Sequence, residues 1–207
     1  MTYTVKEIFY TLQGEGANAG RPAVFCRFSG CNLWSGLDSD RSTAVCQFCD
    51  TDFVGGRRYQ TAEELAAAIE AQWPTPETSD RFVVVTGGEP ALQFDEALKA
   101  ALHRRGFFIA MESNGTVALD AKPDWLTVSP KSGTQLQLTD GDELKVVIPQ
   151  DGLDLAALRR LAFGLFYVQP KDEAGRTREN TDAALALCKA NPSWRLSIQT
   201  HKAVGFP

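Results

Sequence analysis

Four of the five cysteines of the chain lie close together, between Cys26 and Cys49. Three of them, Cys31, Cys46 and Cys49, occupy a loop rich in glycine and polar residues, with fourteen residues between the first two and two between the last pair. A loop of this kind can wrap its thiolates around one metal centre, because thiolate sulfur is a soft ligand that several metals accept. This loop is therefore the first candidate for chemistry.

Two kinds of metal site are compatible with the cysteine spacing. Four thiolates, including that of Cys26, could close a tetrahedral structural zinc site. Alternatively, Cys26 belongs to a strand over residues 22–29, where a small buried thiol fits the apolar pattern. Three thiolates then remain, and on a 4Fe-4S cluster they leave one iron without a protein ligand. An iron with an open position can bind and transform a small molecule.

Other motifs follow one another along the chain. The apolar run FVVVTGGEP at 82–90 ends in a glycine pair and an acid, and the segments YTLQGEG and CDTDF lie at 10–16 and 49–53. ESNGT, SPK, ELKVVIP, VQP and LSIQTHK come afterwards in this order. Together these motifs resemble the radical S-adenosylmethionine (SAM) enzymes and, among them, the 7-carboxy-7-deazaguanine synthase family. The resemblance spans essentially the whole chain, although the insert at 32–45 is longer than in most radical SAM enzymes.

The resemblance implies an activity and its cofactors. Members of the family convert 6-carboxy-5,6,7,8-tetrahydropterin into 7-carboxy-7-deazaguanine with loss of ammonia, a lyase reaction of 7-deazapurine and queuosine biosynthesis. The 4Fe-4S cluster is expected on Cys31, Cys46 and Cys49, where SAM is cleaved and later regenerated, and no residue beyond the cofactors is expected to be catalytic. A reducing electron donor, such as a flavodoxin or a ferredoxin, and a homodimer are also implied.

The resemblance also assigns binding residues. SAM is expected to contact Gly88, Ser129, Pro130, Lys131, Gln169, Pro170, Lys171 and Asp172. The pterin is expected to contact Leu12, Gln13, Gly14, Glu15, Arg27, Thr86, His201 and the terminal carboxylate of Pro207. Thr51 is expected to help hold a magnesium ion that also touches the substrate carboxylate, because magnesium prefers oxygen ligands. The sequence departs from the family pattern in a shorter segment after Phe53 and in Ser113, where threonine is more usual.

Several of these residues also have a purely structural interpretation. The loop QGEG at 13–16 is typical of a tight turn, or its glycines allow backbone amides to approach a flat heterocycle while Gln13 and Glu15 bind its edge. Arg27 either forms a structural ion pair or clamps a substrate carboxylate. His201 either supports the fold or meets the substrate. Two alternatives for the whole chain are a glycyl-radical-enzyme activase and a non-catalytic, zinc-stabilised binding module.

Composition limits the class of protein. A chain of 207 residues with 43% hydrophobic and 23% charged residues fits one soluble domain over residues 1–207. No apolar run approaches the roughly 20 residues of a membrane span, and the first residues lack a secretory signal, so a cytoplasmic location is expected. The acidic excess, 26 Asp and Glu against 21 Lys and Arg, argues against direct binding of nucleic acid.

The hydrophobic pattern predicts an α/β fold with a parallel sheet. Strands are expected at 6–12, 22–29, 82–86, 107–111, 126–129, 144–148, 165–169 and 196–199, and helices at 61–72, 92–105, 153–161 and 181–190. A solvated loop is expected at 175–180. Several motifs directly follow a strand, where parallel α/β folds gather their chemistry. The resemblance implies a trimmed, partial (β/α)6 barrel, with the tail 199–207 folded over its mouth.

Overall fold

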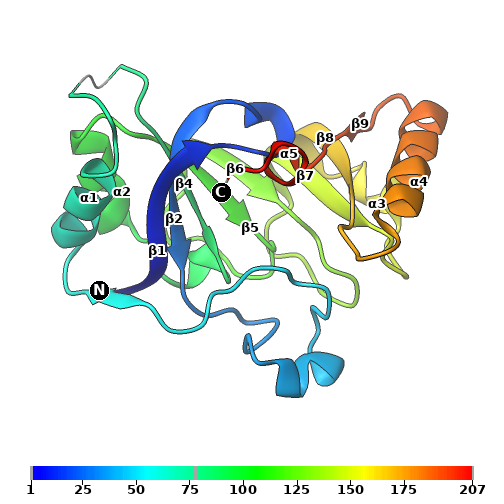
Figure 1. The fold of residues 1–207 in the computed structure, drawn as a ribbon, viewed down its shortest axis with the longest axis horizontal. Coiled ribbons are helices and arrows are strands. Elements are labelled where there is room, and N and C mark those ends of the chain that lie inside the picture. Colours follow the sequence, from blue (N-terminus) through cyan, green and yellow to red (C-terminus); the bar gives the residue numbers. More distant parts are fainter. Residues whose placement is uncertain (1, 77–78, 207) are drawn as a thin grey trace.

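The computed structural model describes residues 2–76 and 79–206 and contains one mixed sheet of nine strands (Figure 1). The strands are β1 (Tyr3–Leu12), β2 (Pro22–Phe28), β3 (Arg57–Tyr59), β4 (Phe82–Gly87), β5 (Phe108–Ser113), β6 (Trp125–Val128), β7 (Asp140–Ile148), β8 (Ala162–Pro170) and β9 (Arg195–Leu196). Their order in the sheet is β3-β1-β2-β4-β5-β6-β7-β8-β9.

Most neighbouring strands run parallel, as the sequence predicts. Each neighbouring pair from β2 to β9 is parallel, whereas β1 is antiparallel to both β2 and β3. Within the described residues the end strands β3 and β9 do not pair, so the sheet is open. The expected α/β class is confirmed in this form.

The described residues also form five α-helices and three short 3-10 helices, of which all but the last α-helix lie between strands in the chain. They are α1 (Ala62–Glu70), α2 (Glu96–Arg104), α3 (Leu155–Leu158), α4 (Thr177–Ala190), α5 (Thr200–Val204), η1 (Gly16–Asn18), η2 (Asp38–Thr43) and η3 (Pro90–Leu92). Helices α1 and α2 lie beside the strands at one side of the sheet, and α3 and α4 lie beside β8 at the other (Figure 1). Within the described part of the chain, no helix combines the length and apolar character that a membrane span requires.

The two faces of the sheet have different partners because successive side chains of a strand point to opposite faces. Val83 and Val85 of β4 belong to the main hydrophobic core, which the apolar sides of α1, α2 and α4 complete. Their neighbours Phe82 and Val84 belong to a smaller cluster. We call the face that carries Phe82 and Val84 the inner face.

The predicted segments that differ from the structure include one helix and one loop. The helix expected at 92–105 begins only at Glu96, because Asp95 caps it by accepting a hydrogen bond from the backbone N–H of Leu98, and residues 90–92 form η3 instead. The solvated loop expected at 175–180 is wrong, because α4 begins at Thr177. Asn180 is buried there, and its Nδ2 donates to the carbonyl of Lys171 at 2.9 Å.

The cap of α2 gives a test of the fold. Asp95 Oδ1 accepts from Leu98 N at 2.9 Å and from the hydroxyl of the fully buried Tyr3 at 2.6 Å. Asp95→Ala should lower the free energy of unfolding by about 2–3 kcal/mol, because it removes the cap and leaves a buried hydroxyl unpaired. Asp95→Asn should lower it by about 1 kcal/mol or less, because one amide oxygen can accept both bonds. Urea unfolding of the two variants measures the difference, and equal losses would contradict this account.

Candidate functional site

The inner face opens into a cavity of about 480 Å³ at the carboxyl ends of the strands. Alternation along each strand divides the side chains between this cavity and the main core. Cys26 of β2 and Met111 of β5 belong to the core, whereas the adjacent Arg27 and Glu112 line the cavity. Pleating therefore supplies the cavity with polar groups from strands that are buried on their other face.

Most of the site residues predicted from the sequence line this cavity. They are Leu12, Gln13, Gly14, Glu15, Arg27, Cys46, Cys49, Thr51, Thr86, Gly88, Ser129, Lys131, Gln169, Pro170, Lys171, Asp172 and His201. Of the predicted residues that the structure describes, Cys31 and Pro130 are not part of the lining. The predicted contact of Pro207 lies outside the described residues.

Cys26 is separated from the other cysteines of its region by the sheet. Its side chain is 0% exposed within the main core, and burial raises the pKa of its thiol. A structural zinc site would therefore lack its fourth thiolate. Among residues 2–76 and 79–206, no three Cys, His, Asp or Glu side chains are grouped closely enough to hold one metal ion. The assignment of the cluster to Cys31, Cys46 and Cys49 stays a prediction.

The surroundings of these cysteines include groups that can stabilise metal-bound sulfur. Cys31 Sγ accepts from the backbone N–H of Leu33 at 3.4 Å and lies 4.0 Å from Nδ2 of Asn114. The pKa of Cys46 is raised, mainly by burial and further by the charges of Cys49 and Cys31, while the ammonium of Lys131 acts in the opposite direction. The three thiols thus lie near enough to influence one another, beside a cation and N–H donors of the kind that stabilise metal-bound sulfur.

The loop after β4 is tied directly to the segment before Cys31. Gly88 N donates to the carbonyl of Phe28 at 3.1 Å, and Glu89 N donates to that of Gly30 at 2.9 Å. A side chain at Gly88 would clash with the Gly30 carbonyl, so this approach requires glycine. The Gly88 N–H is thus bonded within the protein and is not available to a ligand.

Glu89 supports this loop from the interior. It is 0% exposed and accepts hydrogen bonds from Ala91 N, Ser113 Oγ and Asn114 N at 2.7–3.0 Å. Burial raises the pKa of Glu89, and these three donors lower it. The serine that stands at position 113 makes one of these bonds, so it fits the site through its hydroxyl.

The sequence of the loop 13–16 is compatible with a tight turn and with a binding loop, and the structure has features of both. A side chain at Gly14 would clash with the imidazole of His201, and Gly16 has a φ of 65° and abuts the carboxylate of Glu143. The two glycines thus let the backbone of the loop approach His201 and Glu143 closely. Its polar residues face the cavity at the same time, and Gln13 Nε2 donates to Glu112 Oε1 at 2.8 Å.

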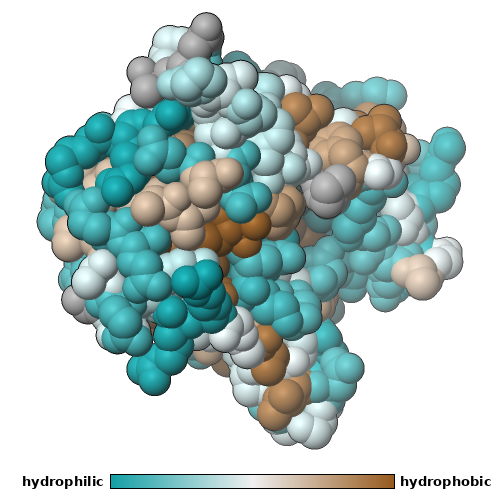
Figure 2. Space-filling view, turned by 60° about the vertical axis from the view of Figure 1, so that its left-hand side comes forward, coloured by the Kyte–Doolittle hydropathy of each residue, from teal (hydrophilic) through white to brown (hydrophobic). Residues whose placement is uncertain are grey.

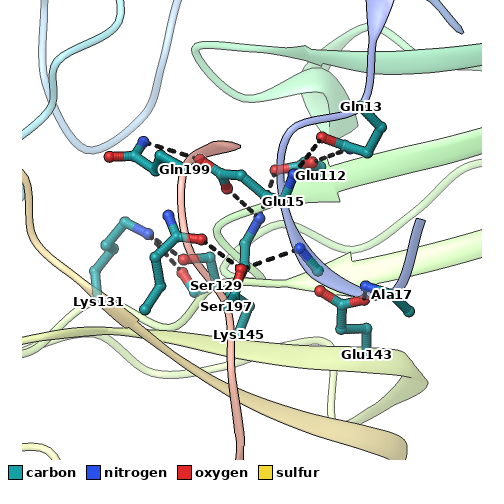
Figure 3. Close-up of polar contacts among 12 residues, drawn as sticks. Gln13, Glu15, Ala17, Glu112, Ser129, Lys131, Glu143, Lys145, Ser197 and Gln199 are labelled. Carbon is teal, nitrogen blue, oxygen red and sulfur yellow. Dashed lines mark hydrogen bonds and ion pairs between the residues drawn. The ribbon is translucent and has the colours of Figure 1, made fainter. Parts of the chain in front are cut away.

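A buried ion network lies behind this loop (Figure 3). The ammonium of Lys145, on β7, donates to Glu15 Oε2 at 2.5 Å and to Glu112 Oε2 at 3.1 Å, and its side chain is 3% exposed. Gln199 Nε2 donates to Glu15 Oε1 at 2.9 Å. Burial alone would raise the pKa of Glu15, but Lys145 and neighbouring amides lower it to about 2. The network thus keeps an ionised carboxylate inside the protein.

Arg27 and the tail both reach the cavity, and both form ion pairs there. Arg27 Nε donates to Glu7 Oε1 at 2.7 Å, which is the structural ion pair considered for it, and its side chain is 22% exposed.

The tail forms α5, whose Lys202 Nζ lies 2.6 Å from Asp50 and 2.9 Å from Asp172. Lys202 therefore joins the loop of Cys49 to the segment after β8. The expectation that the tail folds over the mouth of the cavity is consistent with these contacts.

The charged residues of the site that sequence reasoning missed include Lys145, Lys202 and Glu112. A signal for Lys145 is present, because Glu143 and Lys145 are two residues apart in the segment ELKVVI, whose other residues are apolar, and so share one face. Glu112 was placed at the end of a strand but not assigned to the site. No local pattern points to Lys202, whose two partners are distant in sequence.

Comparison with known proteins identifies relatives. No model of a known protein family matches the chain. A protein from Caulobacter vibrioides named 7-carboxy-7-deazaguanine synthase is 57% identical over 212 residues, covering 100% of both chains. A protein of the same name from Burkholderia multivorans is also 57% identical with the same coverage. The crystal structure of QueE from Escherichia coli is similar with a TM-score of 0.72 and 28% identity, covering 97% of this chain and 95% of that chain.

The ion network predicts a change of stability with pH. The pKa of Glu15 is about 2 in the folded protein against 4.5 ordinarily, so its carboxylate contributes stability above about pH 4.5 that is lost as the pH falls toward 2. Glu15→Gln should lower stability at neutral pH and flatten the decline between these values. Urea unfolding across this pH range measures it. The exposed Glu96→Gln should follow the wild-type curve, and a Glu15→Gln curve parallel to wild type would refute the assignment.

Proposed function

Because the chain belongs to the 7-carboxy-7-deazaguanine synthase family, we propose that the cavity of the inner face is its active site. The protein is a radical SAM enzyme of the lyase type in the queuosine and 7-deazapurine pathway. It converts 6-carboxy-5,6,7,8-tetrahydropterin into 7-carboxy-7-deazaguanine with release of ammonia. The observation that supports the placement is that the predicted cofactor and substrate residues, which are scattered along the chain, line one cavity.

The whole chain, residues 1–207, acts as one radical SAM domain in this proposal. One hydrophobic core extends from Tyr3 on β1 to Trp194 just before β9, which supports a single unit. The open run of parallel strands from β2 to β9 is compatible with a trimmed, partial (β/α)6 barrel whose inner face holds the ligands.

The cysteine loop fits the cofactor that the family implies. Cys31, Cys46 and Cys49 would hold the 4Fe-4S cluster, which is supported by the N–H donors beside Cys31 and by the ammonium of Lys131 near Cys46. When bound, the cluster supplies the electron that cleaves SAM and begins the radical reaction. The residues that would bind SAM are Gly88, Ser129, Pro130, Lys131, Gln169, Pro170, Lys171 and Asp172.

The substrate would lie between the loop 13–16, the strand ends and the tail. Gln13 and Glu15 provide polar atoms for the ring edge, while Leu12, Gly14 and Thr86 shape the cavity around it. Arg27 would clamp the substrate carboxylate by turning from Glu7 or by sharing its guanidinium between the two acids.

The tail contributes the remaining substrate contacts of the proposal. His201 would meet the substrate from α5, beside Gly14, and the carboxylate of Pro207 would accept its N–H groups. A loop and a tail that close over the ring also exclude water, which matters for a radical reaction.

Three further components remain proposals of the family resemblance. Thr51 lines the cavity near the cluster loop and would hold a magnesium ion together with the substrate carboxylate. A flavodoxin or ferredoxin would reduce the cluster, and two copies of the chain would form a homodimer.

Variants of single cysteines test the cluster assignment. After anaerobic reconstitution with iron and sulfide, the wild-type protein should be brown and should form 7-carboxy-7-deazaguanine from the pterin. Alanine at Cys31, Cys46 or Cys49 should abolish both the EPR signal of the reduced cluster and turnover. Cys26→Ala should retain both, and Cys188→Ala on α4 controls for the loss of a thiol. Loss of the cluster signal in Cys26→Ala, or a colourless zinc-containing wild type, would overturn the assignment.

The magnesium site makes a separate prediction. Thr51→Val removes the oxygen ligand at nearly constant volume, so the magnesium concentration for half-maximal turnover should rise by about tenfold or more. Thr51→Ser keeps the hydroxyl and should resemble wild type. Turnover that persists after chelation of divalent ions, in a protein with an intact cluster, rules the site out.

A further inference from the structure

We propose that Lys145 is a specificity-determining residue of the enzyme, which donates a hydrogen bond to the 4-oxo group of the pterin between acceptor groups of Glu15 and Glu112. The inference rests on the proposed function, because it assumes that the pterin occupies the cavity of the inner face. It goes beyond that function because it names the residue that selects which edge of the pterin ring the site binds.

The position of Lys145 provides the first argument. Its side chain rises from β7, and its ammonium lies between the carboxylates of Glu15 and Glu112 (Figure 3). The distances are 2.5 Å and 3.1 Å, and all three residues line the cavity. The cavity wall therefore presents an acceptor, a donor and an acceptor in sequence.

Each group of this arrangement has capacity left for a ligand. An ammonium has three N–H donors, and the described residues provide two acceptors to Lys145. Each carboxylate oxygen can accept two hydrogen bonds. The oxygens of Glu112 accept two hydrogen bonds, from Gln13 and from Lys145, which leaves two of its four acceptor sites. Those of Glu15 accept from Lys145, Gln199 and Gln169, which leaves one.

Lys145 is held in its charged form by its surroundings. Burial alone would lower the pKa of Lys145, but the carboxylates of Glu112, Glu15 and Glu143 raise it. A charged donor that is 3% exposed cannot be rehydrated when a ligand fails to provide an acceptor. Ligands that place a second donor at this point should therefore be rejected strongly.

The substrate has the complementary pattern on one edge. In a 5,6,7,8-tetrahydropterin the carbonyl at position 4 lies between the N–H groups of positions 3 and 5, which gives a donor, an acceptor and a donor. A 2,4-diamino analogue replaces the carbonyl by an amino group and loses the hydrogen at position 3. It therefore places a donor opposite the ammonium and an acceptor opposite one of the carboxylates. Discrimination between the two rings consequently reports on this whole edge, and the part of it that is lost with the ammonium reports on Lys145.

The test compares the binding of two ligands to the reconstituted enzyme with SAM, under anaerobic conditions. They are 6-carboxy-5,6,7,8-tetrahydropterin and its 4-amino counterpart, and the dissociation constants are measured by calorimetry. The wild-type protein should prefer the 4-oxo compound by about a hundredfold or more. Lys145→Arg, which keeps a charged donor, should retain most of the preference. Lys122→Met, at an exposed lysine, is the matched control and should behave as wild type.

Loss of the ammonium should remove most of the discrimination. Lys145→Met leaves two carboxylates facing each other, so the double variant Lys145→Met/Glu112→Gln is included because it preserves the net charge of the network. Either variant, folded and with normal iron content and SAM affinity, should prefer the 4-oxo compound by less than about tenfold. A folded double variant with the wild-type preference overturns the role of Lys145. A wild-type protein that turns over the pterin without discriminating also overturns it, whereas one that binds neither ring contradicts the proposed function itself.

Discussion

The ammonium of Lys145, buried between Glu15 and Glu112, is the interaction on which the site depends most. Charges removed from water require partners with good geometry, and removing one partner leaves an uncompensated charge that is strongly destabilising. Here the three charged residues come from the loop 13–16, from β5 and from β7. The amide of Gln13 also bonds to Glu112, and that of Gln199 links Glu15 to the tail. Pairing the charges therefore fixes the relative positions of segments that are far apart in sequence.

A second constraint is the pleat of the parallel strands. Because neighbouring residues face opposite sides, Cys26 packs in the core while Arg27 reaches the cavity, and the same division separates Met111 from Glu112. This geometry counts against the four-thiolate zinc site, since a thiol in the core cannot join a ligand set on the loop. The alternation of side chains along the strands thus determines both the packing of the core and the polar lining of the cavity.

Much of the fold can be predicted from the sequence because apolar runs and turn residues are local signals. The segments that were misjudged are those where local signals conflict. The polar run at 175–180 is typical of a loop, yet it contains the first turn of α4, with Asn180 bonded to Lys171. In the site, residues that end strands were found, whereas Lys145 and Lys202 were missed because their roles depend on partners that only the folded chain brings near.

Several weak contacts of the tail together determine the position of α5. Exposed ion pairs contribute little stability one by one. Lys202, however, contacts Asp50, the neighbour of Cys49, and also Asp172 after β8, while Thr200 N donates to Gly14 O at 2.9 Å. The projecting loop with η2, which leads into Cys46 and Cys49, stands out from the body of the molecule at the bottom of Figures 1 and 2. Since α5 bridges this loop, the segment after β8 and the loop 13–16, the position of α5 over the cavity depends on all three.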